Sequence, residues 1–140
     1  MSTMSIVGGG LFTSNVNTDQ LVLGVNFHYK KANLLVSMDT DVLDPMTRGN
    51  LDNFNYQPII TTYDNFNRYR DNHRVLFFNE HKWYNVAGVS SGLLAIAFCN
   101  SIRVTHLDLY GFNDLNNKTS DRYIKFNELL STNISYTLHG

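Results

Sequence analysis

The feature that most constrains this chain is a turn of small polar residues followed by an apolar helix and then a strand. Ser90-Ser91-Gly92 opens a mostly apolar run that predicts a buried helix over 91–100. This helix leads into an apolar strand over 104–109. The first turn of a helix leaves its N–H groups unpaired and carries the positive end of the helix dipole. The turn therefore predicts a site for an anion such as phosphate.

Apolar runs elsewhere indicate parallel strands that are covered on both faces. The run over 34–38, for example, stops at Asp39. Strands are expected over 5–7, 21–26, 34–38, 56–63, 75–78, 104–109 and 134–138, and helices over 91–100 and 121–130. The expected fold class is α/β, a single domain over residues 1–140 with a Rossmann-like, open and mostly parallel sheet. Ligands of such sheets bind beyond the carboxyl ends of the strands.

Composition narrows the possible partners and the cellular setting. The net charge of -1 gives no basis for a dedicated nucleic-acid binder. The single cysteine, Cys99, excludes an internal disulfide and falls in the apolar helix pattern, so a packed thiol is expected. Residues 1–5 lack the charged start of a signal peptide, and no apolar run approaches the ~20 residues of a membrane span. We therefore expect a cytoplasmic protein, and its many asparagines are typical of AT-rich genomes, including those of phages.

Two strand ends in the first half carry a candidate nucleotide site. Gly8, Gly9 and Gly10 follow the first strand, where glycine lets the backbone turn sharply and approach a ligand closely. Thr13 stands where a dinucleotide fingerprint needs its third glycine, so NAD binding is not supported and a plain tight turn stays open. Asn26 ends the second strand, where it can hydrogen-bond a base or ribose, or can simply cap a turn.

Acidic residues follow the third strand. Asp39 stands where a general base is expected at this edge of the sheet. Asp39 and Asp41 are also similar to the Asp-x-Asp pair that holds a divalent cation in metal-dependent glycosyltransferases. Asp44-Pro45 indicates a solvated turn, so the metal is kept only as an alternative. The segment Asn-Glu-His-Lys-Trp at 79–83 adds an acid, an imidazole and an ammonium group at the same edge.

Together these short motifs resemble the sialyltransferase-like glycosyltransferases, in particular the bacterial family that uses CMP-sialic acid. The matching segments are Val7-Gly8-Gly9-Gly10, Val25-Asn26, Ser90-Ser91-Gly92 with Ala95 and Ala97, and Leu109-Tyr110-Gly111-Phe112-Asn113. The resemblance implies a Rossmann-like core in which the glycine loop and Asn26 hold the nucleotide and the turn at 90–92 holds its phosphate. It also implies a nucleotide-sugar donor of the CMP-sugar type, with no further cofactor.

The family's catalytic histidine precedes its last helix, and Thr119-Ser120-Asp121 offers no counterpart. Asp39 is therefore the first candidate for activating an acceptor hydroxyl and Asp121 the second. Arg70 or Arg74 could pair with the departing phosphate, or both could equally lie on a solvated loop. The expected function is a small glycosyltransferase that binds a nucleotide-sugar and transfers its sugar to a hydroxyl. The alternatives are a nucleotide-binding viral or phage accessory protein without catalysis, and metal-dependent transfer.

Overall fold

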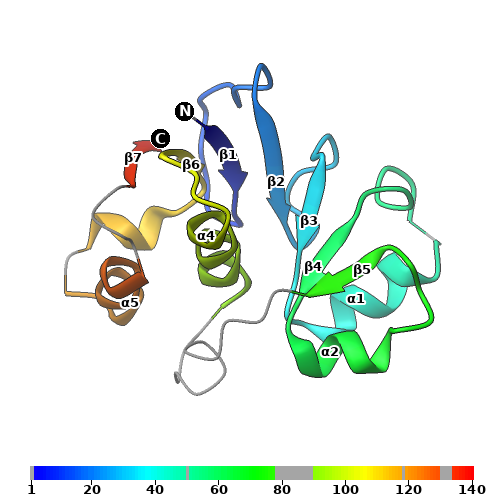
Figure 1. Ribbon diagram of the computed structural model, residues 1–140. Coiled ribbons are helices and arrows are strands. Elements are labelled where there is room, and N and C mark those ends of the chain that lie inside the picture. Colours follow the sequence, from blue (N-terminus) through cyan, green and yellow to red (C-terminus); the bar gives the residue numbers. More distant parts are fainter. Residues whose placement is uncertain (1, 50, 78–89, 118, 130–133) are drawn as a thin grey trace.

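The described strands form one parallel sheet with helices on both faces (Figure 1). The computed structural model describes residues 2–49, 51–77, 90–117, 119–129 and 134–140. Its strands are β1 (Thr3–Val7), β2 (Leu21–Val25), β3 (Leu34–Val36), β4 (Ile59–Thr61), β5 (Val75–Phe77), β6 (His106–Tyr110) and β7 (Ser135–His139). Its helices are α1 (Thr40–Thr47), α2 (Tyr63–Arg68), α4 (Ser91–Ser101) and α5 (Asp121–Leu129), with a 3-10 helix, η1 (Asn113–Asn116).

The strand order places the start of the chain in the interior of the sheet. From β1 the chain adds β2, β3, β4 and β5 on one side and β6 and β7 on the other, giving the order β5-β4-β3-β2-β1-β6-β7. Each pairing in this order is parallel. The predicted open parallel α/β sheet is confirmed. The order reverses between β1 and β6, and open sheets of this kind bind ligands beyond the strand ends at such a reversal.

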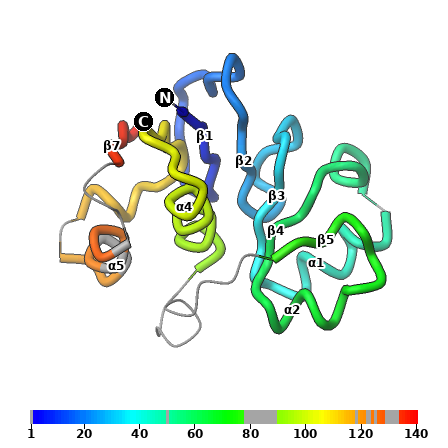
Figure 2. The backbone as a smooth tube through the Cα atoms, viewed as in Figure 1, coloured from blue at the N-terminus to red at the C-terminus, as the bar shows by residue number. Residues whose placement is uncertain are grey.

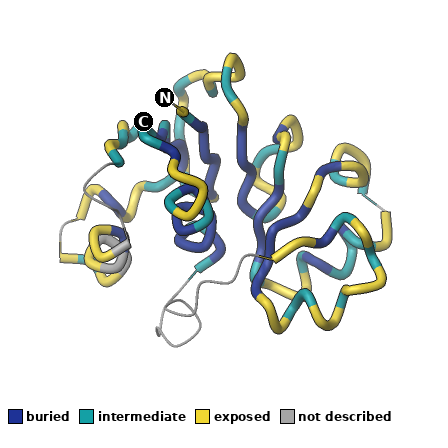
Figure 3. The backbone as a smooth tube through the Cα atoms, viewed as in Figure 1, coloured by how far each residue is buried: buried dark blue, intermediate teal, exposed yellow. Residues whose placement is uncertain are grey.

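Both faces of the central strands are buried, which explains their continuous apolar sequences. Ile6 and Leu109 lie opposite each other on β1 and β6 and belong to the core cluster that also contains the buried residues of α4. The next positions, Val7 and Tyr110, belong to a cluster on the other face. Figure 3 shows the resulting pattern, in which β1, β2 and α4 are largely buried while α2 and α5 carry much exposed surface.

A loop of residues 8–20, all described, makes the crossover from β1 to β2 (Figure 2). It contains no helix. Phe12 and Val16 from this loop pack against Val7 and Val22. The loop therefore does part of the covering that a crossover helix provides in other parallel sheets.

The turn expected at Asp44-Pro45 is wrong, because these residues lie inside α1. Proline lacks an N–H group, and the residue before it is disfavoured in a helix. Leu43 and Met46 are nevertheless fully buried against the sheet beside Leu35 and Ile59. Burial of two large side chains, at about 1.5–3 kcal/mol each, outweighs one lost helical hydrogen bond.

The strand expected over 56–63 is also too long. Only Ile59–Thr61 is strand, and α2 begins at Tyr63. Thr62 ends the strand and caps the helix, because its side chain accepts a hydrogen bond from the N–H group of Asn65 at 3.4 Å. The predicted strand was too long because Thr61 and Thr62 are β-branched and continue the strand pattern into the cap of α2.

The single cysteine is packed in the interior of the protein. Cys99 is fully buried on α4, and burial raises the pKa of its thiol to about 12, so the packed thiol is confirmed. Within the described ranges, no helix has the length and apolar character needed to cross a membrane.

Candidate functional site

A cavity of about 750 Å³ opens at the carboxyl edge of the sheet, where the strand order reverses between β1 and β6. It collects the segments that follow β1, β2, β3 and β6 together with the start of α4. The sequence-predicted residues that line it are Gly8, Gly9, Gly10, Asn26, Asp39, Ser90, Ser91 and Gly92. The structure therefore brings every predicted nucleotide-binding residue and one of the two predicted catalytic acids to a single place.

The glycine loop is shaped first by its contact with the end of β6. The N–H group of Gly8 donates to the carbonyl of Tyr110 at 2.7 Å, and that of Gly10 donates to the carbonyl of Gly111 at 2.8 Å. A Cβ atom on Gly10 would lie 2.7 Å from the Gly111 oxygen, and one on Gly111 would lie 2.6 Å from the Gly8 oxygen. Two of the three glycine N–H groups are thus already paired within the protein, and the missing side chains let two backbone segments cross closely.

Asn26 starts a tight turn after β2 that faces the cavity. Its backbone is left-handed, with φ of 54°, and the N–H group of His28 donates across the turn to the carbonyl of Val25 at 3.1 Å. Asparagine tolerates this conformation better than most residues. The Asn26 Oδ1 atom is buried and has no hydrogen-bond partner within the described part of the chain. An unpaired buried acceptor costs about 1–3 kcal/mol.

The start of α4 forms another wall of the cavity. Ser90 is the N-cap, and its hydroxyl accepts a hydrogen bond from the N–H group of Leu93 at 3.3 Å. The N–H groups of Ser91 and Gly92 lie in the first turn, so the helix itself offers them no acceptor. The ring of Phe112 lies beside Gly92, where a Cβ atom would be 3.1 Å from it. The predicted polar cap of a buried helix is confirmed, and the first turn of the helix lines the cavity.

Ser91 ties the end of β3 to α4. Its hydroxyl oxygen accepts a hydrogen bond from the Met38 N–H group at 2.9 Å and lies 3.5 Å from a carboxylate oxygen of Asp39. Asp39 is exposed and precedes α1 at the cavity rim. Asp41 is exposed on the first turn of α1 and is not among the described residues that line the cavity. The described residues hold no group of three His, Cys, Asp or Glu side chains placed to bind a metal ion.

Asp121, Arg70 and Arg74 are not among the described residues that line the cavity. Asp121 is the exposed first residue of α5 and is absent from the described cavity lining. Arg70 is exposed in the loop after α2 and is likewise not part of that lining. The suggestion that Arg74 pairs with a phosphate is wrong, because its guanidinium donates to the backbone carbonyls of Gln57, Met46 and Phe54 at 2.8–3.1 Å. The candidate segment 79–83 lies outside the described residues.

Sequence reasoning missed several side chains of the cavity. His28 lies against the glycine loop, since a Cβ atom on Gly9 would be only 2.6 Å from its Nε2 atom. Phe112, Asn113 and Asp114 also line the cavity, from the segment that follows β6. The signal for His28 was its place two residues after Asn26, in the tight turn that follows β2.

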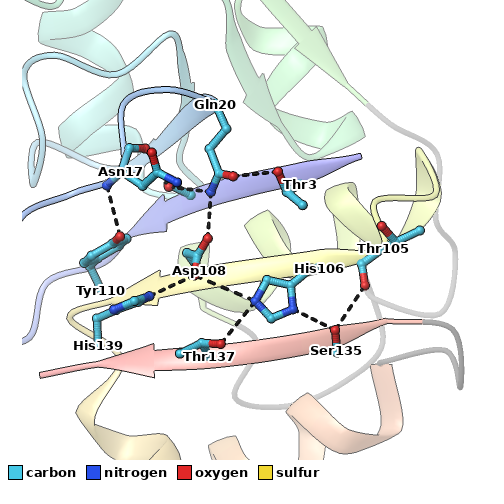
Figure 4. A network of polar contacts seen from close by, with 11 residues as sticks. Thr3, Asn17, Gln20, Thr105, His106, Asp108, Tyr110, Ser135, Thr137 and His139 are labelled. Atoms are coloured by element: carbon cyan, nitrogen blue, oxygen red, sulfur yellow. Dashed lines mark hydrogen bonds and ion pairs between the residues drawn. The ribbon is translucent and has the colours of Figure 1, made fainter. Parts of the chain in front are cut away.

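A second polar cluster lies on the face of the sheet formed by β1, β6 and β7 (Figure 4). The Asp108 carboxylate accepts hydrogen bonds from His139 at 2.8 Å and from Gln20 at 2.8 Å. His106 lies 3.7 Å from the same carboxylate, and His139 stacks on Tyr110 with 4.5 Å between ring centroids. Burial alone would raise the pKa of Asp108, but the hydrogen bonds and nearby histidines outweigh it, so the pKa is lowered. This cluster joins β7 to the sheet.

The sequence and the structure were compared with those of known proteins. No protein-family model, curated protein or solved structure matches the chain. The chemistry available at the cavity is therefore judged from its own groups. These are helix N–H donors, a buried amide oxygen, an imidazole and an exposed carboxylate.

Proposed function

We propose that this chain binds a nucleotide, in the form of a nucleotide-sugar such as a CMP-sugar, in the cavity between the ends of β1 and β6. The observation that carries the proposal is the meeting of the first turn of α4 with the ends of β1 and β2 around one cavity at the strand reversal. The helix turn supplies donors and a positive dipole for a phosphate. The unpaired Oδ1 atom of Asn26 supplies an acceptor for an amino or hydroxyl group of a base or ribose.

We also propose that the protein transfers the sugar, because Asp39 lies at the rim of the same cavity, where it can act as a general base. In this reaction Asp39 takes the proton of an acceptor hydroxyl, whose oxygen then bonds to the anomeric carbon of the sugar. The bond between that carbon and the phosphate oxygen breaks, and its electron pair leaves with the nucleotide phosphate. The N–H groups and dipole of α4 stabilise the charge that collects there. The resemblance to sialyltransferase-like enzymes supports this chemistry for the donor.

A nucleotide-binding role without catalysis is the second candidate. It is favoured by the position of Asp121, which is not among the described residues of the cavity, and by the missing counterpart of the family's catalytic histidine. In that case the cavity retains a nucleotide and Asp39 serves only to hold Ser91.

The two candidates are separated by one series of assays. Thermal shift with a panel of nucleotides and nucleotide-sugars tests binding, since a ligand at 100 times its Kd stabilises a protein by about 2.7 kcal/mol. Release of the sugar is then followed in wild type, Asp39→Asn and Asp41→Asn. A general base contributes at least about 100-fold, so Asp39→Asn is expected to lose that much activity while Asp41→Asn keeps it. Binding without turnover supports the second candidate, and no binding across the panel refutes both.

A further inference from the structure

The described lining of the cavity is poor in positive charge for a site that would hold phosphate. It contains two carboxylates, Asp39 and Asp114, and among the described lining residues His28 is the one side chain able to carry a positive charge. Resting on the proposed function, we propose that His28 is the cationic partner of the ligand's phosphate, beside the first turn of α4.

The turn after β2 holds His28 at this position. The hydrogen bond from the His28 N–H group to the Val25 carbonyl closes the turn at 3.1 Å, and the left-handed backbone of Asn26 makes so tight a turn possible. The imidazole then lies against Gly9, because a Cβ atom on that residue would be 2.6 Å from Nε2 and 2.8 Å from Cε1. Glycine at this position therefore makes room for the ring at the cavity wall.

An anionic ligand in this cavity would need a positive charge beside it. The exposed carboxylate of Asp39 follows β3 and lines the same cavity, so a bound phosphate would meet a negative charge at the rim. Lys30 and Lys31 share the loop of His28 but are not among the described lining residues. The N–H groups of Gly8 and Gly10 are already engaged by β6 carbonyls. A protonated imidazole offers both the compensating charge and a charge-assisted hydrogen bond.

The test compares CMP with cytidine, which lacks the phosphate, by calorimetric titration of the full chain at pH 6 and low salt. At this pH most imidazole groups are protonated. We expect His28→Gln to weaken CMP binding about 10-fold and to leave cytidine binding unchanged. His28→Arg, which keeps a positive charge, is expected to retain CMP affinity within about 3-fold. His73→Gln is the matched control, because His73 is exposed before β5 and lines a different hollow; it is expected to bind CMP like wild type.

The outcomes separate this inference from the proposed function. Wild-type protein that binds no CMP overturns the CMP form of the proposed function and, with it, the role of His28. CMP binding that His28→Gln leaves unchanged, or an equal loss of CMP and cytidine affinity, overturns only the role of His28. Gly9→Ala is a second variant that keeps the imidazole in the chain but displaces it from the loop. It is expected to reduce CMP affinity in the same direction, and a Gly9→Ala protein that binds CMP like wild type contradicts the placement of the ring.

Discussion

Replacing Gly111 with alanine tests whether close backbone crossing is what the glycines at the strand reversal provide. Gly111 has φ of 76°, and a Cβ atom there would lie 2.6 Å from the Gly8 oxygen and 2.9 Å from the Gly10 oxygen. Gly49, at the end of α1, has a similar φ of 69°, but a Cβ atom there meets no atom of the described residues within 4 Å. The two substitutions therefore share the conformational penalty and differ in the steric one.

The magnitudes follow from these contacts. A left-handed backbone costs alanine about 1–2 kcal/mol at either position. Gly111→Ala must also move the backbone that carries the Gly8 and Gly10 hydrogen bonds. Overpacking of this kind costs about 1–3 kcal/mol, and a weakened backbone hydrogen bond costs about 1 kcal/mol more. We therefore expect the free energy of unfolding to fall by about 1 kcal/mol in Gly49→Ala and by about 4 kcal/mol in Gly111→Ala.

Urea and thermal denaturation measure both variants against wild type. For a chain of this length, 1 kcal/mol corresponds to about 3 °C in Tm. The expected decreases are about 3 °C for Gly49→Ala and about 12 °C for Gly111→Ala. Equal decreases in the two variants would refute the reasoning, because they would show that the close approach of the segments after β1 and β6 tolerates a side chain.

Three further predictions concern the hydrogen bonds of Arg74, Asp108 and Ser91. Arg74→Lys keeps the charge but cannot reach three carbonyls at once, so denaturation should show a loss of about 2 kcal/mol; an unchanged midpoint would contradict the structural role. The lowered pKa of Asp108 means that its carboxylate stabilises the fold above pH ~4 and that this contribution is lost as the pH falls through the lowered value. Asp108→Asn should therefore have a lower Tm than wild type at pH 6, and the difference should shrink as the pH falls below about 4. A constant difference would contradict the account. Ser91→Ala removes the acceptor of the Met38 N–H group and should lower the free energy of unfolding by about 1–2 kcal/mol in urea titrations; no change would mean that water replaces the hydroxyl.

The sheet was predictable because its central strands are covered on both sides. Buried parallel strands such as Leu21–Val25 read as continuous apolar runs, and this pattern does not depend on distant contacts. The two missed helices depend on such contacts. α1 forms around Pro45 because Leu43 and Met46 are buried against the sheet, and α2 forms because Thr62 caps it. Neither tertiary burial nor the exact cap position is visible in a local pattern.

The residues of the candidate site that follow strand ends were predictable from the sequence. The positions of side chains that depend on distant contacts were not. Parallel strands end at one edge, so Gly8, Asn26 and Asp39 had to lie near each other once the sheet was recognised. Arg74 could not be placed in this way. Its carbonyl partners lie on the segments before β4 and at the end of α1, and the sequence contains no sign that these segments meet.

The most direct test of the central claim is to map nucleotide binding by NMR on the backbone amides of the full chain. CMP added to ¹⁵N-labelled protein is predicted to shift the amide signals of Ser91 and Gly92 in the first turn of α4, together with that of Gly9. The amides of Gly49 and His73, which line a separate hollow, are predicted to stay in place. Shifts confined to that hollow, or no shifts at saturating CMP, would contradict a nucleotide site between β1 and β6.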